Sequence, residues 1–216
     1  AALTGKTTST APKEYVVNLF DKFAGHFEST LVGDLEYNIP KRLAEIIIAH
    51  SKSPSLGTLL DLGCGTGLFG SSINHVSTRL SGVDLSSKML AEAKEKRIYD
   101  KLIEADITDF LLNENLNFYY FVSTDVFIYI GDLSEIFHLI ASRNNKGGKF
   151  AFSTEHIHGD GFRLEQSGRY SHSKKYIDGL CEEFGFTLTF FETRNLRKEH
   201  HRFITGGLYL LDFNKN

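Results

Sequence analysis

Three glycines at alternate positions close an apolar segment that carries one acid. Residues 59–67 read Leu-Leu-Asp-Leu-Gly-Cys-Gly-Thr-Gly, and Asp84 ends a second apolar segment 17 residues after Gly67. Glycine has no Cβ, so the backbone of such a loop can approach a ligand closely. A carboxylate at the end of the next strand suits the two hydroxyls of a ribose. The spacing therefore predicts a cofactor that contains a nucleoside, bound at the carboxyl edge of a parallel sheet.

The glycine spacing also separates the classes of nucleoside cofactor. A dinucleotide fingerprint would have a glycine at position 68, where this chain has Leu, and a Walker loop needs a Lys that does not follow these glycines. An acid such as Asp61 would repel a phosphate, whereas it suits the ammonium and sulfonium groups of S-adenosylmethionine (SAM). The segment 61–67 resembles the first motif of the class I SAM-dependent methyltransferases. That resemblance implies SAM as the cofactor, S-adenosylhomocysteine (SAH) as the product, and a loop that binds through Asp61, Gly63, Cys64, Gly65 and Gly67.

Strands and helices alternate around this loop. Strands are predicted at 58–62, 80–84, 101–105, 117–124 and 149–154, with helices near 67–75, 87–97 and 132–143. Such alternation indicates right-handed crossovers and a parallel sheet. After Ser173 a helix is predicted to run to about Phe184, with Gly185 as its cap. Two β-rich runs follow, 186–194 and 203–212, which can pair antiparallel. The prediction is an α/β fold: a Rossmann-like three-layer sandwich with a seven-stranded, mostly parallel sheet, an antiparallel last strand and an N-terminal helical lid.

The sequence before the first strand predicts a linker and two helices. Residues 1–13 are rich in Thr and Ser and are interpreted as a linker, which leaves 14–216 as the methyltransferase domain. Apolar residues recur at helical spacing from Tyr15 to about His26, and a second helix follows Pro40. No Met precedes Ala1, which leads us to expect either that the chain was cut from a longer one or that simple processing removed the Met.

The composition indicates a soluble globular domain and disfavours several other classes of protein. The 216 residues carry a net charge of −3, with 41% hydrophobic and 24% charged residues, as in ordinary soluble domains. The absence of a basic field disfavours a nucleic-acid substrate or a membrane surface. No apolar run is long enough to span a bilayer, and neither a secretory signal nor a disulfide pattern is evident, so a cytoplasmic location is predicted.

Several residues at strand ends are candidates to bind the cofactor. Asp84 is expected to accept the ribose hydroxyls, with Leu85 beside it and Met89 one turn later against the adenine; the alternatives are a helix cap for Asp84 and core packing for Met89. By resemblance, Asp106 and Ile107 would face the adenine, although Asp106 could also be only a cap. The fourth strand ends at Thr124 and Asp125. Asp125 is expected to bind the methionyl end, to orient the acceptor or to cap a helix.

The resemblance extends beyond the superfamily. The segments 15–24, 35–40, 126–133 and 167–173 are similar to predicted methyltransferases that follow tetratricopeptide repeats on bacterial chains, and 1–5 resembles the end of a last repeat helix. An upstream repeat region that binds a protein partner is therefore a hypothesis. In that family the aromatic N-terminal helix resembles a lid, which makes Tyr15, Phe20 and Tyr37 candidates to cover the cofactor. Aromatic core packing is the alternative for each of them.

No catalytic base can be chosen from the sequence. Candidates are Glu155, His156, Arg169, Tyr170 and His172, and each of them could instead be a capping or loop residue. Arg169 could also clamp an acidic acceptor. The His156-x-His158 and His200-His201 pairs lack further ligands at zinc spacing, so no metal is predicted. A basic run at 194–202 is interpreted as a hairpin tip.

The function predicted is methyl transfer from SAM to an unidentified small molecule or protein partner. The alternatives are a SAM-binding regulatory or interaction module without turnover and a nicotinamide-dependent oxidoreductase. The glycine spacing and the β-rich ending disfavour the oxidoreductase.

Overall fold

The structure, a computed structural model, describes residues 9–28, 37–199 and 202–214, without the side chains of 197–199 and 202. The sequence-based interpretations of 1–8, of 35–36 and of His200-His201 concern residues outside these ranges. Among the described residues, no helix has the length and apolar character needed to cross a membrane.

Five parallel strands form the centre of one sheet, in the order β3-β2-β1-β4-β5. They are β1 (Thr58–Leu62), β2 (Arg79–Asp84), β3 (Lys101–Glu104), β4 (Tyr120–Ser123) and β5 (Gly148–Ile157). Because β1 and β4 are adjacent although β2 and β3 lie between them in sequence, the strand order reverses beside β1. Open α/β sheets bind ligands at such a reversal, outside the carboxyl ends of the strands.

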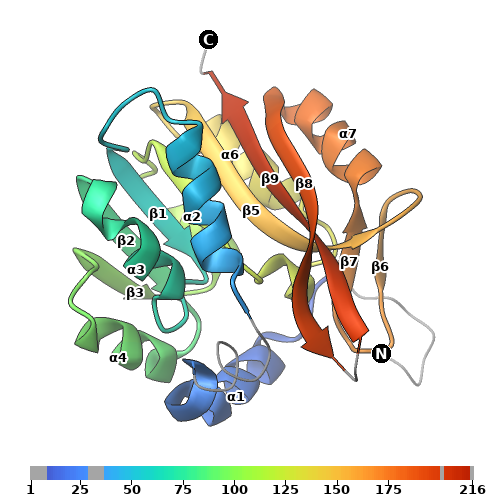
Figure 1. Cartoon of the computed structure of the whole chain (residues 1–216), viewed down its shortest axis with the longest axis horizontal. Coiled ribbons are helices and arrows are strands. Elements are labelled where there is room, and N and C mark those ends of the chain that lie inside the picture. Colours follow the sequence, from blue (N-terminus) through green and yellow to red (C-terminus); the bar gives the residue numbers. More distant parts are fainter. Residues whose placement is uncertain (1–8, 29–36, 200–201, 215–216) are drawn as a thin grey trace.

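Helices cover both faces of the sheet, so the predicted three-layer arrangement is confirmed (Figure 1). The helices are α2 (Ile39–Ala49), α3 (Leu68–Ile73), α4 (Ser87–Glu95), α5 (Ile107–Asn113), α6 (Ser134–Arg143) and α7 (Lys174–Phe184). Successive strand residues point to opposite faces. Phe121 and Phe150 therefore pack in the core beside α5, α6 and α7, whereas Tyr120 and Ala151 pack in the core beside α2 and α3.

The last two strands complete the expected seven-stranded path. β9 (Arg202–Phe213) runs antiparallel to β5, and β8 (Phe186–Glu199) is antiparallel to β9. Ser173 begins α7, because its hydroxyl accepts a hydrogen bond from the N–H of Tyr176 at 3.1 Å. Gly185 ends the helix with a φ of 76°, as the sequence predicted.

Two short strands, β6 (Phe162–Leu164) and β7 (Tyr170–Ser173), were not predicted and bring the sheet to nine strands among the described residues. They are antiparallel to each other, and β7 pairs parallel with β5 at residues 155–157. Strands of three and four residues around a turn containing Gly168 are too short to give an alternating pattern. We call residues 162–173 the β6–β7 ribbon.

The N-terminal segment differs from its predicted boundary. The helix α1 (Lys13–Phe23) starts two residues before Tyr15 and continues as the 3-10 helix η1 (Ala24–His26). Thr10, inside the predicted linker, forms an antiparallel bridge with Ile130. This part of the predicted linker is therefore hydrogen-bonded to the loop after β4.

Candidate active site

A cavity of about 870 Å³ opens at the carboxyl ends of the central strands. Residues from the loops after β1, β2, β3 and β4 line it on one side, and α1 lines it on the other. Figure 1 shows α1 beneath these strand ends, apart from the two helical layers. The lining includes Gly63, Cys64, Gly65, Asp84, Leu85, Asp106, Ile107, Thr124, Asp125, Phe20, Tyr37 and Arg169, all of which the sequence had marked as candidates.

The glycines of residues 63–67, the glycine loop, meet different structural requirements. Gly63, Gly65 and Gly67 have positive φ angles of 74°, 52° and 87°, a region that side chains with a Cβ rarely adopt. A Cβ on Gly63 would lie 2.2 Å from Cγ2 of Val126, whereas a Cβ on Gly65 would meet no atom within 4 Å. Gly65 therefore leaves open space on the cavity side, where a ligand can approach the backbone.

Asp84 lies at the end of β2 and contacts this loop directly. Its Oδ2 accepts a hydrogen bond from the N–H of Gly65 at 2.8 Å, and its Oδ1 accepts one from the N–H of Ser86 at 2.9 Å. Burial raises the pKa of this carboxyl, although both hydrogen bonds oppose the rise. The cap of α4 is Ser86 and not Asp84, because the Ser86 hydroxyl accepts from the N–H of Met89.

Asp106 caps a helix and also lines the cavity. Its Oδ1 accepts hydrogen bonds from the N–H groups of Thr108 and Asp109, which makes it the N-cap of α5. The other oxygen lies 3.3 Å from Nζ of Lys13, at the start of α1. Both interpretations of Asp106 from the sequence are therefore compatible with its position.

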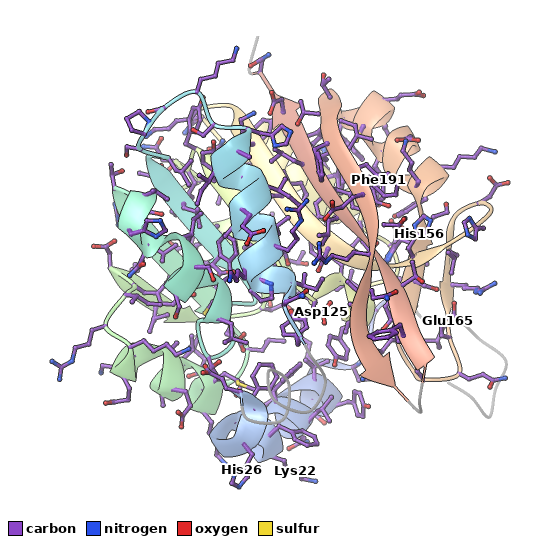
Figure 2. All side chains as sticks on the ribbon, in the orientation of Figure 1. Lys22, His26, Asp125, His156, Glu165 and Phe191 are labelled. Carbon is purple, nitrogen blue, oxygen red and sulfur yellow. The ribbon has the colours of Figure 1, made fainter. Side chains whose placement is uncertain are left out.

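Asp125 stands in the left-handed region, with a φ of 57°, directly after β4. Its N–H donates to Oγ of Ser153 on β5 at 2.8 Å. This backbone conformation costs free energy for a residue that has a Cβ. Residues held in this conformation cluster at functional sites. Figure 2 shows Asp125 between the sheet and α1, and the residue lines the cavity there.

Side chains of α1 contact several residues around the opening of the cavity. The Phe20 ring packs edge-on against Tyr129 with centroids 5.6 Å apart, and the Ser86 hydroxyl donates to Oδ1 of Asp21 at 2.5 Å. Beyond η1, Glu28 accepts a hydrogen bond from Thr66 at 2.6 Å. No residue of α1 itself is buried. In Figure 2, Lys22 of α1 and His26 of η1 lie at the lower edge of the molecule, away from the sheet.

Four of the cofactor candidates do not line the cavity: Asp61, Gly67, Met89 and Tyr15. Asp61 is completely buried beneath the loop, where its Oδ2 accepts a hydrogen bond from the hydroxyl of Tyr99 at 2.7 Å. Met89 is also completely buried, in agreement with the packing alternative. Tyr15 is 52% exposed on the other side of α1. The helical spacing of α1 could not show which of its aromatic residues faces inward.

Among the five candidates for a catalytic base or acceptor clamp, only Arg169 lines the cavity. It comes from the β6–β7 ribbon, and its Nη1 lies 3.9 Å from Oε1 of the buried Glu155. Figure 2 shows His156 beside Phe191, near β8, and their ring centroids are 5.8 Å apart. Tyr170 belongs to the same ribbon, and its side chain is buried.

His172, on β7, is a buried residue that contacts the backbone of the loop after β4. Its Nε2 lies 3.0 Å from the carbonyl oxygen of Ile130 and 2.9 Å from that of Gly131, so this nitrogen is the protonated one. Burial lowers the pKa of His172 to about 4. A neutral imidazole that donates to two carbonyl groups and lies outside the cavity lining does not suit the role of base.

Several residues that line the cavity were not predicted from the sequence, among them Lys13, Val126, Tyr129 and Thr66. Val126 and Tyr129 stand in a segment whose family resemblance was recognised, and that resemblance was the available signal. For Lys13 there was no signal, because its partners Asp106 and Asp109 lie more than 90 residues away. Within the described ranges, no group of three His, Cys, Asp or Glu side chains is arranged to hold a metal ion.

Comparison with known proteins agrees with this geometry. A family model described as "Methyltransferase domain" matches residues 60–152. A malonyl-acyl-carrier-protein O-methyltransferase from Pectobacterium atrosepticum is 30% identical over 103 residues, which are 48% of this chain and 38% of that protein. Its counterpart from Enterobacter lignolyticus is 27% identical over 95 residues, 44% of this chain and 36% of that protein. The matched segment thus spans little more than a third of these curated relatives.

Solved structures show the same fold. Magnesium protoporphyrin IX methyltransferase from Synechocystis PCC 6803 with bound SAH has a TM-score of 0.70 at 16% identity, over 94% of this chain and 99% of that one. A SAM-dependent methyltransferase from Clostridium acetobutylicum has a TM-score of 0.66 at 19% identity, over 92% and 100% of the two chains. The chain therefore has the Rossmann-like fold of class I methyltransferases, and its residues 60–152 are similar to a methyltransferase domain.

Proposed function

We propose that this protein transfers a methyl group from SAM to an acceptor that is a small molecule or is carried by a partner protein. The observation that carries the proposal is the pairing of Asp84 with the glycine loop. The carboxylate ends its strand at the cavity beside Gly65, the glycine with open space in front of it. A ribose carboxylate next to a backbone open to a ligand suits a nucleoside cofactor, as in other sheets of this class.

The positions of the lining residues support an assignment for each part of SAM. Asp84 would accept the ribose hydroxyls, and Asp106 with Ile107 would face the adenine at the end of β3. Gly63, Cys64 and Gly65 would lie along the methionyl part, which would extend toward Thr124 and Asp125. Phe20 and Tyr37 would cover the cofactor from the side of α1.

Methyl transfer from a sulfonium is an in-line displacement: the acceptor atom forms a bond to the methyl carbon while the bond from sulfur to that carbon breaks, which leaves SAH. Such a step depends on alignment of the two reactants and on exclusion of water. The protein supplies alignment through rigid strand ends. The contacts of α1 with the cavity rim limit the access of solvent.

We further propose a carboxylate as the acceptor group. Arg169 lines the cavity, and a guanidinium can bind a carboxylate through two parallel hydrogen bonds. A carboxylate is already ionised at neutral pH and needs no base to become a nucleophile. This suits a cavity that His156, Tyr170 and His172 do not line. The names of the malonyl-acyl-carrier-protein O-methyltransferases also favour an acid-bearing acceptor.

The wider setting of the domain is also a proposal. Residues 14–216 would form the methyltransferase domain together with Thr10 and Lys13, which contact it, and the residues before them would link it to an upstream tetratricopeptide region that binds a partner protein. A cytoplasmic location is supported by two buried cysteines, Cys64 and Cys181, that form no disulfide.

Thermal unfolding in the presence of ligands tests the cofactor. Saturating SAM or SAH is expected to raise the Tm, because a ligand that binds only the folded state stabilises it, whereas NAD is expected to leave the Tm unchanged. A rise with NAD and none with SAM or SAH would contradict the proposal in favour of an oxidoreductase.

Incubation with radiolabelled SAM and malonyl-acyl-carrier protein tests turnover. Label is expected in the malonyl group as a base-labile ester. If SAH binds but no label enters this acceptor or any component of a cell extract, the protein is a SAM-binding module without turnover.

A further inference from the structure

Tyr99, between α4 and β3, lies beneath the glycine loop and fills space that three glycines leave. A Cβ on Gly67 would come within 3.0 Å of the Tyr99 ring, one on Gly70 within 2.5 Å of its hydroxyl, and one on Gly82 within 3.0 Å of the ring. These glycines belong to the loop, to α3 and to β2. One side chain therefore determines the spacing of the three elements that carry the loop.

The hydroxyl of Tyr99 forms a hydrogen bond with Asp61, which stands two residues before Gly63. It donates to Oδ2 at 2.7 Å, while Oδ1 of this completely buried carboxyl has no partner among the described residues. The charged or titratable groups that face Asp61 are Tyr99 itself, Asp84 and the buried thiol of Cys64. The negative charge of Asp84 disfavours ionisation of Asp61. The hydrogen bond that the Tyr99 hydroxyl donates favours the ionised form and so opposes this effect.

We propose that Tyr99 is a positioning residue for cofactor binding, which acts through its ring on the shape of the glycine loop and through its hydroxyl on the charge of Asp61. The inference rests on the proposed function. The ammonium group that SAM and SAH share binds more tightly above an ionised carboxylate than above a neutral carboxylic acid. The hydrogen bond stabilises the ionised form of Asp61. The Tyr99 ring holds the backbone of the glycine loop in its position relative to Asp84.

The titration of Asp61 gives the proposal a distinctive signature. Burial raises the pKa of this carboxyl to about 7, and the hydrogen bond from Tyr99 is the influence that lowers it. Removal of the hydroxyl should therefore raise the pKa of Asp61 further. The pH below which the cofactor binds weakly should move upward in the same variant, whereas a purely structural role would change stability without moving this pH.

Isothermal titration of SAH between pH 6 and pH 9 tests the proposal. In the wild type we expect affinity to rise with pH near the pKa of Asp61. Tyr99→Phe keeps the ring, and we expect binding about tenfold weaker at pH 7, as for the loss of a hydrogen bond to a charged group, with recovery at higher pH. Asp61→Asn should bind weakly at every pH. The matched control is Tyr119→Phe, because Tyr119 is 45% exposed and does not line the cavity.

The outcomes separate this inference from the proposed function. If the wild type does not bind SAH, the proposed function fails. If the wild type binds and Tyr99→Phe has the same affinity and the same pH profile, only the role of Tyr99 is wrong. Should Tyr99→Phe not fold, Gly70→Ala displaces the ring instead; weaker SAH binding in that variant supports the inference, and unchanged binding overturns it.

Discussion

The carboxylate of Asp84 accepts a hydrogen bond from the backbone N–H of Gly65 at 2.8 Å, so the two parts of the candidate cofactor site are directly connected. The end of β2 and the loop after β1 thus have a fixed relative position before any ligand arrives. Pre-organisation of this kind reduces the free energy that binding must spend on ordering the site.

Substitution of Asp84 should weaken binding of the cofactor without unfolding the domain. For Asp84→Ala we expect SAH affinity to fall by about 1.5–3 kcal/mol, the range for hydrogen bonds to a charged group. Isothermal titration measures this loss. The control is Asp160→Ala, because Asp160 is paired with Lys175 on the exposed surface. Equal affinities for Asp84→Ala and the wild type would show that the ribose lies elsewhere.

The two faces of α1 should differ in their effect on the cofactor. Phe20 lines the cavity and packs against Tyr129, whereas Tyr15 on the same helix is exposed and does not line it. We expect Phe20→Ala to weaken SAH binding about fivefold to tenfold, mainly through faster dissociation, since related complexes differ mostly in that rate. Stopped-flow displacement of SAH measures the rate.

Tyr15→Ala is the matched control for this prediction and should leave the dissociation rate unchanged. The Tm of both ligand-free variants should change little, because no residue of α1 is fully buried. A dissociation rate that increases equally in both variants would mean that α1 contributes through its own stability and not by covering the cofactor.

The part of the site that was predictable depended on local sequence. Gly63, Gly65 and Asp84 were found because a glycine loop after one strand and a carboxylate after the next occupy neighbouring strand ends in any sheet of this topology. Gly67 is the exception within the motif. It needs a positive φ at the start of α3 and room for the Tyr99 ring, and it does not line the cavity.

The part that was not predictable depended on contacts between distant segments. Tyr99 showed no motif, and its importance follows only from its position under Gly67 and Gly70. The pairing of Thr10 with Ile130 likewise joins segments 120 residues apart. The apolar runs of β4 and β5 have no counterpart in strands as short as β6 and β7, so the ribbon that carries Arg169 was not predicted.

Arg169 should determine affinity for the acceptor and not for the cofactor. With malonyl-acyl-carrier protein as substrate, we expect Arg169→Ala to raise the KM for this acceptor by about tenfold or more, because a charge-assisted pair is lost. The KM for SAM should stay unchanged. Arg169→Lys should restore only part of the affinity, since an ammonium cannot reproduce the two parallel hydrogen bonds of a guanidinium.

The same ribbon supplies the control for Arg169. Arg163 is 64% exposed, is paired with Glu165 and does not line the cavity, so Arg163→Ala should keep the wild-type KM for the acceptor. If Arg163→Ala raised this KM as much as Arg169→Ala did, the general positive charge of the ribbon, and not a clamp in the cavity, would explain the effect.

His172 should make the stability of the domain depend on pH. Burial lowers its pKa to about 4 in the folded protein, whereas an unfolded chain has a His pKa of about 6.5. Between these two pH values the unfolded state binds the proton more readily, so stability is complete above pH 6.5 and is lost as the pH falls toward 4. Between pH 7 and pH 5 this group alone should cost about 2 kcal/mol.

Urea unfolding of the wild type and of His172→Gln at pH 7 and pH 5 measures this contribution. The Gln side chain retains an N–H donor for the carbonyl groups of Ile130 and Gly131 but does not titrate. The difference between the two proteins removes the contributions of other groups, including Asp61, whose raised pKa acts in the opposite direction. We expect the wild type to lose about 2 kcal/mol more than His172→Gln, and His75→Gln, which changes an exposed side chain, to behave as the wild type. An equal loss in the wild type and His172→Gln would show that His172 is protonated in the folded domain.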